Sequence, residues 1–178
     1  STRKESSAAS DVYKRQEYTS CRESAIVTDL SPLRKFEILG PDAENLMQYT
    51  LTRNVKKLSA GQVVYSAMCY DNGCMVDDGT LLKFGQDNFR WVGGQEYGGE
   101  WLKEQAKKKN FKVWVKSSTD QIHNIAVQGP NSRKILKKFV WTPDTQPSID
   151  DLQWFRLTIA RIDSVTGTPI VVSRTGYT

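Results

Sequence analysis

The sequence contains an internal repeat, and no other feature restricts the possible folds as strongly. Residues 36–51 read FEILGPDAENLMQYTL, and residues 125–140 read IAVQGPNSRKILKKFV. When Gly40-Pro41 is aligned with Gly129-Pro130, apolar residues match on both sides of the pair: Phe36 with Ile125, Ile38 with Val127, Leu46 with Ile135, Met47 with Leu136 and Leu51 with Val140. The simpler alternative is two unrelated strand-to-helix turns, but such turns have no reason to agree at so many positions.

Each copy of the repeat has the pattern of a short strand followed by a helix. Apolar residues alternate before the Gly-Pro pair and recur at helical spacing after it. Proline suits the first turn of a helix, where its missing N–H has no intrahelical partner to lose. Asp42 and Asn131 follow the prolines and could accept hydrogen bonds from the free N–H groups there. We therefore expect an α+β fold with two related strand–helix half-units, mixed or antiparallel sheets and β-hairpins.

Composition excludes several classes of protein. The chain has 178 residues, 38% of them hydrophobic, and a formal net charge of +5. This length allows a substantial core, and no apolar run approaches the roughly 18 residues of a membrane span. Lysines cluster in residues 103–116 and 132–139, which indicates solvated helix faces or an anion-binding surface. These runs lack the aromatic spacing of an RNA-binding motif, so we expect neither a nucleic acid nor a membrane partner. Three cysteines, an odd number, favour a reducing compartment. We expect a cytoplasmic location, or the mitochondrial matrix in a eukaryote.

The two ends of the chain differ from the rest. Residues 1–20 are polar, have no periodic apolar pattern and contain no signal-peptide core. We expect them to be a disordered or non-native tail, with order beginning near Ala25. Residues 21–178 would then be the N-terminal part of a larger domain, in which residues 55–118 form a hairpin-containing subdomain. The chain stops at PIVVSRTGYT, directly after an expected strand, which suggests that the sequence is truncated.

The strongest local signal for a hairpin is Asn72-Gly73, because both central residues of a type I′ turn need a positive φ. If these two residues form the turn, Ala67 lies opposite Asp78. Side chains alternate between the faces of a strand, so Tyr65 and Asp78 would share one face and Asp77 would lie on the other. Tyr65 would then be a diagonal neighbour of Asp78, within reach of its aromatic ring.

Two interpretations of Asp78 remain open from the residues alone. Asp77-Asp78 could be the polar end of an edge strand with no chemical role. Alternatively, Asp78 is an acid on a partly apolar face beside a phenol, where loss of solvent would tune it for proton transfer.

Other candidates carry less information. The glycine-rich stretch VGGQEYGGEW (92–101) has neither dinucleotide-binding nor P-loop spacing, so a strand-to-helix loop is expected. His123 is the only histidine, so no histidine-based metal cluster exists, and we expect no metal site. Residues 150–162 have the pattern of a strand with an aromatic entry, where Trp154 would be a core residue.

Taken together, the stretches DLSPLRKFEILGPDA, YSAMCYDNGCMVDDGTLLKF, IAVQGP and VVSRTGYT resemble the folate-binding aminomethyltransferase family, the T-protein of glycine cleavage. The resemblance covers about residues 22–178. It implies a folate site built from two related α+β halves, which would explain the repeat. It also implies transfer of a one-carbon unit from an aminomethyl group on a lipoyl carrier protein to tetrahydrofolate, with release of ammonia.

The resemblance also implies roles for individual residues. The family's key carboxylate is the second acid of an Asp-Asp pair after the hairpin, which corresponds to Asp78 as catalytic and cofactor-binding residue. The aromatic residue before the turn corresponds to Tyr65. Aromatic positions of the second half correspond to Trp154 and Tyr177, and such rings would hold a flat pterin and a benzoyl group.

Three departures from the family pattern alter the expected pocket. Family members commonly show Ser-His-Met where this chain has Ser31-Pro32-Leu33, so Leu33 would form a changed wall. The usual Val-Asn pair is Val92-Gly93 here, which removes an amide that could bond the pterin edge. Family chains also continue beyond SRTGYT, where they supply further pocket walls and a tail-binding arginine, so the fragment itself is expected to be inactive.

Two alternatives to the aminomethyltransferase remain. One is a tetrahydrofolate-dependent demethylase that acts on another small donor, in which case no lipoyl carrier is needed. The other is a non-catalytic folate-binding relative of the iron–sulfur assembly type. That relative carries a Lys-Gly-Cys-Tyr motif where this chain has residues 175–177, and the absent cysteine favours the enzyme.

Overall fold

The structure is a computed structural model that describes residues 2–176, with side chains from residue 11 onward. The chain alternates helices and strands in the following order: α1 (Thr2–Glu23), β1 (Ile26–Asp29), β2 (Arg34–Leu39), α2 (Ala43–Thr50), the 3₁₀ helix η1 (Val55–Lys57), β3 (Val63–Cys69), β4 (Met75–Lys83), β5 (Asn88–Gly93), α3 (Tyr97–Lys108), β6 (Trp114–Ser117), β7 (Ile125–Gln128), α4 (Ser132–Leu136), β8 (Val140–Trp141), β9 (Arg156–Ile162) and β10 (Pro169–Arg174).

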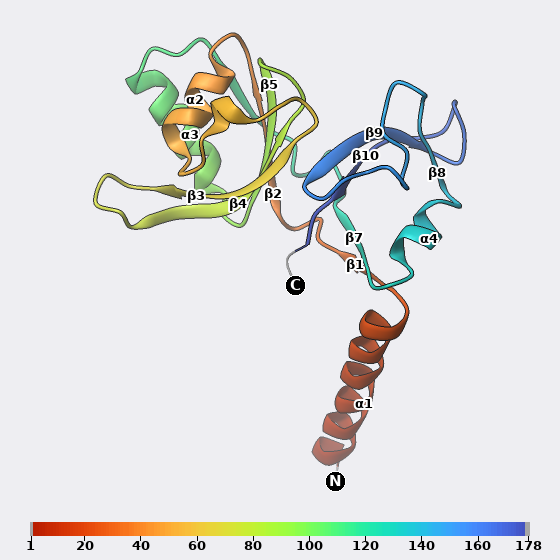
Figure 1. Cartoon of the computed structure of the whole chain (residues 1–178). Helices are drawn as coiled ribbons and strands as arrows, with labels where there is room; N and C mark the ends of the chain where they lie inside the picture. Colours follow the sequence, from red (N-terminus) through yellow and green to blue (C-terminus); the bar gives the residue numbers. More distant parts are fainter. Residues whose placement is uncertain (1, 177–178) are drawn as a thin grey trace.

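In residues 2–176, all strand pairs are antiparallel and fall into three sheets. The largest has the order β3-β4-β5-β2-β6, a second has the order β10-β9-β8, and β1 pairs with β7. Helices α2 and α3 lie together against the five-stranded sheet, while β9 and β10 lie in the other half of the molecule (Figure 1). The expected α+β class with antiparallel sheets is confirmed. The expected subdomain, residues 55–118, contains β3, β4, β5 and β6 of the largest sheet, whose remaining strand is β2.

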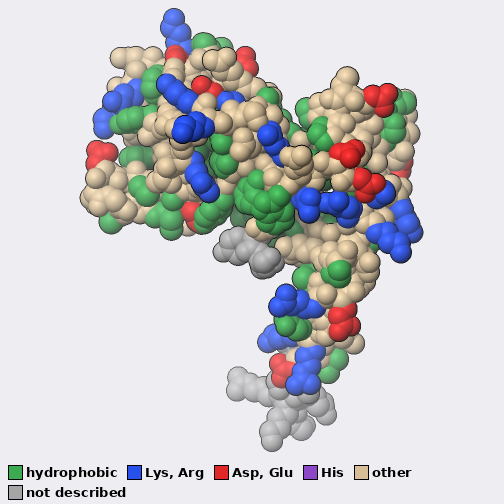
Figure 2. Space-filling model, in the orientation of Figure 1, with side chains coloured by type: hydrophobic (Ala, Val, Ile, Leu, Met, Phe, Trp, Pro, Cys, Tyr) green, Lys and Arg blue, Asp and Glu red, His purple; other side chains and the backbone are tan. Residues whose placement is uncertain are grey.

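The main core fills the space between α2, α3 and the inner face of the five-stranded sheet. Its fully buried side chains include Phe36, Ile38, Leu46, Met47, Met68, Leu81, Phe89, Trp91 and Leu102. The lysines of α3 lie on the opposite, exposed side of that helix, as expected for a solvated face. Basic side chains are spread over both halves on the face that Figure 2 shows, rather than in one continuous stripe.

The two copies of the repeat have the same local structure. In each, a strand ends at a glycine with positive φ, 128° at Gly40 and 130° at Gly129, and a helix follows. The carbonyl of each glycine accepts a hydrogen bond three residues on, from Ala43 at 2.9 Å and from Ser132 at 3.0 Å. A positive φ favours glycine because other residues are strained there. The strand–Gly-Pro–helix prediction therefore holds for both copies.

The correspondence extends to the strands beside the two copies. β6 pairs with β2, and β1 pairs with β7, each antiparallel and in an equivalent register. Because β1 leads directly into β2 and β6 leads into β7, each half receives a strand from the other half. The connections β1–β2 (residues 30–33) and β6–β7 (residues 118–124) therefore run past each other between the halves, where Leu30 N donates to Asn124 O at 2.7 Å.

The side chain of Asp42 does not cap α2, contrary to the expected role. Its oxygens accept hydrogen bonds from Lys112 N at 2.9 Å and from Asn45 Nδ2 at 3.0 Å. These bonds, led by the one from Lys112, lower the pKa of Asp42. Neither Asp42 nor Asn131 makes a side-chain cap. The backbone N–H of each donates to a carbonyl of the neighbouring segment, Lys112 O or Ser24 O.

The hairpin turn differs from the expected two-residue type. Tyr70 N donates to Cys74 O at 2.8 Å and closes a loop of three residues, 71–73. Gly73 N also donates to Tyr70 O at 2.9 Å, and Gly73 has a φ of 83°. Asn72 does not need a positive φ, because its Oδ1 accepts a hydrogen bond from Cys74 N at 3.0 Å and stabilises the turn from the side chain. A bulge next to Cys69 then pairs it with Met75 rather than Val76. Beyond the bulge, the expected register is restored.

The N-terminal residues form a helix where the sequence predicts a disordered tail. Helix α1 extends from Thr2 to Glu23 and projects away from both halves (Figure 1). From residue 11 onward no side chain of this helix is buried. A helix with no buried face needs no periodic apolar residues, so the sequence pattern did not reveal it. Within the described residues, no helix combines the length and apolar character needed to cross a membrane.

Candidate functional site

The candidate site lies on the face of the five-stranded sheet opposite α2 and α3. The strand register places four residues in one row across four strands, Tyr65 on β3, Thr80 on β4, Val92 on β5 and Lys35 on β2. Directly opposed residues of neighbouring strands share a face and lie in contact range. Asp78 is two residues from Thr80 along β4, so it shares this face.

Tyr65 and Asp78 are in direct contact across the hairpin. The phenol hydroxyl of Tyr65 donates a hydrogen bond to Asp78 Oδ2. The Tyr65 side chain is 43% exposed, so a ligand could reach both the ring and the carboxylate. The predicted juxtaposition of this phenol and this acid is confirmed, although their part in binding or catalysis stays a prediction.

Asp77 lies on the opposite face and serves the fold. It is buried, and its carboxylate accepts hydrogen bonds from Trp91 Nε1 at 3.3 Å and from Gly94 N at 3.2 Å. These bonds connect β4 to the end of β5 and to the turn before α3. The predicted division of the Asp-Asp pair between two faces is therefore correct, with Asp77 inside and Asp78 outside.

Gly93 lies on the inner face of the sheet, next to Asp77, and not on the face of Tyr65. A Cβ atom at Gly93 would lie 2.2 Å from Asp77 Oδ2 and 2.6 Å from Trp91 Nε1. The asparagine that the family resemblance leads one to expect there does not fit unless Asp77 and Trp91 move. Val92 shares the Tyr65 face, whereas a cofactor role for Gly93 is limited to its backbone and stays a prediction.

Lys35 ends the row and was not identified from the sequence. Only 1% of this residue is exposed, and its Nζ donates to Ser31 O at 2.9 Å and to Leu33 O at 2.7 Å. Among the described residues, no carboxylate lies within ion-pair distance of it. Burial, followed by the charges of Arg34 and Arg90, lowers the pKa of Lys35. Its two hydrogen bonds hold the connection that carries the predicted site residue Leu33.

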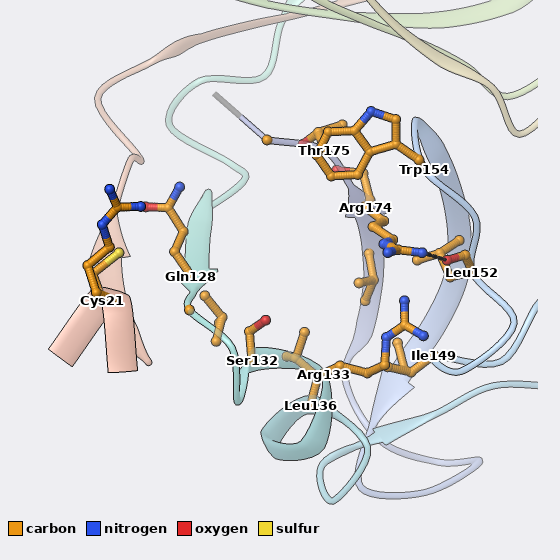
Figure 3. A pocket seen from close by; sticks show the side chains of 16 residues that line it. Cys21, Gln128, Ser132, Arg133, Leu136, Ile149, Leu152, Trp154, Arg174 and Thr175 are labelled. Atoms are coloured by element: carbon orange, nitrogen blue, oxygen red, sulfur yellow. Dashed lines mark hydrogen bonds between the residues drawn. The ribbon is translucent and has the colours of Figure 1, made fainter. Parts of the chain in front are cut away.

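Trp154 is exposed, contrary to its expected place in the core. Its side chain is 59% exposed and packs edge-on against Phe155 at 5.5 Å between ring centroids. Phe155 O accepts a hydrogen bond from Val63 N at 2.9 Å, which ties this segment to the strand that carries Tyr65. Trp154 lines a cavity in the second half (Figure 3) that neither Tyr65 nor Asp78 lines. Tyr177 lies outside the described residues.

Comparisons with known proteins agree on the family. The model of the GCVT N-terminal domain matches residues 5–178, so the match includes most of the segment expected to be a non-native tail. A trimethylamine-oxide aldolase from Ruegeria pomeroyi is 60% identical over 163 residues, which is 92% of this chain and 21% of that protein. An aminomethyltransferase from Alkaliphilus metalliredigens is 35% identical over 165 residues, which is 91% of this chain and 42% of that protein.

Solved structures agree on the fold. The glycine cleavage system aminomethyltransferase T from Bartonella henselae superposes with a TM-score of 0.67 at 20% identity, covering 92% of this chain and 42% of that one. The heterotetrameric sarcosine oxidase from Corynebacterium has a TM-score of 0.59 at 13% identity, covering 86% of this chain and 71% of that one. The chain thus spans about a fifth of the length of the first of these curated relatives and less than half of the length of the second. From the family match, the chain belongs to the GCVT N-terminal domain family.

Proposed function

We propose that the chain is the folate-binding part of a tetrahydrofolate-dependent one-carbon transferase. The observation that carries this proposal is the contact between Tyr65 and Asp78 on the exposed face of the five-stranded sheet. The family match and the names of the relatives, which are enzymes, support a transferase over a non-catalytic folate-binding protein.

The residues present fit a flat, partly apolar cofactor. The half-exposed ring of Tyr65 offers an aromatic surface in one row with Thr80 and Val92, and flat ligands bind to such surfaces. Trp154 offers a second exposed ring in the other half. Tetrahydrofolate, when bound, would supply the nitrogen atoms that accept the one-carbon unit.

Asp78 would act on the donor. A carboxylate oriented by the Tyr65 hydroxyl can align an amine through a charge-assisted hydrogen bond. It can also stabilise positive charge that develops as a carbon–nitrogen bond breaks. Replacing the carboxylate with an amide removes the charge and leaves the shape. Asp78→Asn therefore measures how much the negative charge of Asp78 contributes to the reaction rate.

Two classes of donor are candidates, and the comparisons favour one of them. The relative at 60% identity is named for trimethylamine oxide, which supports a small methylated amine or amine oxide as donor. The aminomethyltransferases, such as the one at 35% identity, support an aminomethyl group on a lipoyl carrier protein. The higher identity favours the small donor.

The test has two steps. Tetrahydrofolate is first titrated into the chain while quenching of tryptophan fluorescence is followed, because Trp154 is exposed in the site's second half. Turnover is then measured in a longer protein that carries this chain, with a methylated amine oxide and with an aminomethylated lipoyl carrier as alternative donors. We expect the chain to bind tetrahydrofolate saturably and Tyr65→Ala to weaken this binding. If neither the chain nor the longer protein binds tetrahydrofolate, the proposed function is wrong.

A further inference from the structure

Lys35 is a buried cation near the start of β2, and it contacts both connections that link the two halves. Its ammonium group donates to Ser31 O at 2.9 Å and to Leu33 O at 2.7 Å, and both carbonyls belong to the β1–β2 connection. Its backbone is paired with the β6–β7 connection, because Lys35 N donates to Thr119 Oγ1 at 3.0 Å and Ser118 N donates to Lys35 O at 2.8 Å. One residue therefore holds the two connections together.

Packing alone does not account for a lysine at this position. A buried ammonium group loses its hydration, which costs free energy unless its N–H donors find acceptors. A methionine side chain is also long and unbranched, and it fills an apolar space without this cost. The ammonium group of Lys35 has three donors, and it holds two carbonyls of a turn that lies outside any helix or strand. What distinguishes the lysine from an apolar residue here is therefore the fixed position of that turn.

Leu33 connects this turn to the candidate site. It directly precedes β2, two residues before Lys35, which ends the row that begins at Tyr65. Its side chain is half-buried, and the family resemblance leads one to expect it in the pocket wall. Leu33 N donates to Leu30 O at 3.0 Å, and Leu30 N donates to Asn124 O at 2.7 Å. A shift of this turn would therefore move Leu33 relative to the face that carries Tyr65.

We propose that Lys35 is a positioning residue: its ammonium group fixes the β1–β2 connection so that Leu33 borders the ligand bound on the Tyr65 face. The part that concerns the ligand rests on the proposed function, whereas the fixing of the connection does not. Lys35 itself touches no ligand in this arrangement, because only 1% of the residue is exposed. Its effect on binding therefore passes through Leu33.

The first test compares Lys35→Met with Lys83→Met in tetrahydrofolate titrations followed by tryptophan fluorescence, and in urea unfolding. Lys83 is the matched control, because it is also a buried lysine of the five-stranded sheet, but its ammonium group pairs with Glu44 on α2. We expect Lys35→Met to weaken tetrahydrofolate binding about tenfold, roughly the effect of losing one leucine contact with a ligand. Lys83→Met should lose stability and change this affinity less than about twofold, since it does not touch the β1–β2 connection.

A double-mutant cycle checks that Lys35 acts through Leu33. If it does, Leu33→Ala combined with Lys35→Met binds tetrahydrofolate no more than about twofold more weakly than Leu33→Ala alone, because both changes remove the same contact. Losses of affinity that multiply would show independent effects and overturn this route.

Amide hydrogen exchange tests the fixing of the connection without any ligand. Lys35→Met should speed exchange at Leu30 and Leu33 by about tenfold or more relative to Trp91 in β5, since the turn opens locally more often. If Lys35→Met fails to fold, Lys35→Gln replaces it in each measurement, with the same expected direction, because its shorter side chain offers a neutral amide in place of the ammonium group.

Equal changes of tetrahydrofolate affinity in Lys35→Met and Lys83→Met, or unchanged exchange at Leu30 and Leu33, would overturn the inference. Faster exchange at these two amides, in a protein that binds no tetrahydrofolate, would support the fixing of the connection by Lys35 and reject the proposed function. The two failures are therefore distinguishable.

Discussion

The hydroxyl of Tyr65 donates a hydrogen bond to the carboxylate of Asp78 across one β-hairpin. The two residues come from adjacent strands and from the face that is not covered by α2 and α3. A bulge next to Cys69 compensates for the three-residue loop, and without it the register would slip by one residue. Such a slip would turn Asp78 to the inside and Asp77 to the outside.

Asp78→Asn in a longer protein that carries this chain should lower the turnover rate by about 100-fold or more, the usual size of positioned acid–base and electrostatic effects. Tetrahydrofolate affinity should change less than about tenfold. Steady-state turnover and fluorescence titration measure the two quantities. Asp71→Asn in the exposed hairpin loop is the matched control. Turnover of Asp78→Asn at the wild-type rate would leave Asp78 as a surface carboxylate with no catalytic part.

Tyr65→Ala should weaken tetrahydrofolate binding, the quantity that Asp78→Asn is expected to leave nearly unchanged. Losing the ring removes a binding surface, and we expect tetrahydrofolate affinity to fall by about tenfold. Tyr65→Phe keeps the ring and removes only the hydroxyl that orients Asp78, so it should retain affinity and reduce turnover. Folate titrations of the two variants in parallel check this, and equal affinities of Tyr65→Ala and wild type would contradict it.

Asp77→Ala should reduce stability rather than folate binding. It leaves the buried Nε1–H of Trp91 without an acceptor, at a cost of about 1–3 kcal/mol, whereas the exposed Gly94 N–H can be paired by water. Urea unfolding followed by tryptophan fluorescence measures the loss. Asp78→Ala, on the exposed face, is the comparison and should change the free energy of unfolding by less than about 1 kcal/mol.

Lys35 should make stability depend on pH in the alkaline range. Its pKa in the folded protein is lowered by burial, so the unfolded chain binds more protons as pH rises from the folded pKa toward the ordinary value. The free energy of unfolding therefore rises with pH across that window. Relative to Lys35→Met, which cannot titrate, the wild type should gain stability there. Urea unfolding of both proteins at several pH values tests this, and parallel curves would rule it out.

Gly129→Ala should destabilise the repeat strongly, by at least about 2 kcal/mol. Its φ is positive, and an added Cβ would lie 2.5 Å from Ser24 O and 2.7 Å from Ala25 Cα. Gly73→Ala is the control, because its φ is also positive but nothing lies within 4 Å of the added atom. The control should lose about 1 kcal/mol from backbone strain alone. Similar losses in thermal unfolding would show that crowding at Gly129 has no effect.

The sequence by itself determined the features that depend on local periodicity. The Gly-Pro pairs and the apolar spacing around them predict both strand–helix units, since a proline at a helix start and a glycine at positive φ are local requirements. Two-residue alternation along the hairpin likewise placed Asp78 with Tyr65. The predicted two-residue turn was wrong, because the loop has three residues and a bulge next to Cys69 restores the register. The resemblance to a family added the expected chemistry.

Only the tertiary structure decided which distant segments meet. Lys35 joins the row of Tyr65 because β2 pairs with β5, and no local pattern encodes that choice of neighbour. The segment before β9 meets β3 through the carbonyl of Phe155, and the adjacent Trp154 side chain stays exposed. Arg133 and Arg174 lie 41 residues apart in the sequence, and they line one cavity because α4 and β10 pack around it. Pairing and packing between distant segments depend on the whole arrangement of the sheets, so short-range sequence patterns do not determine them.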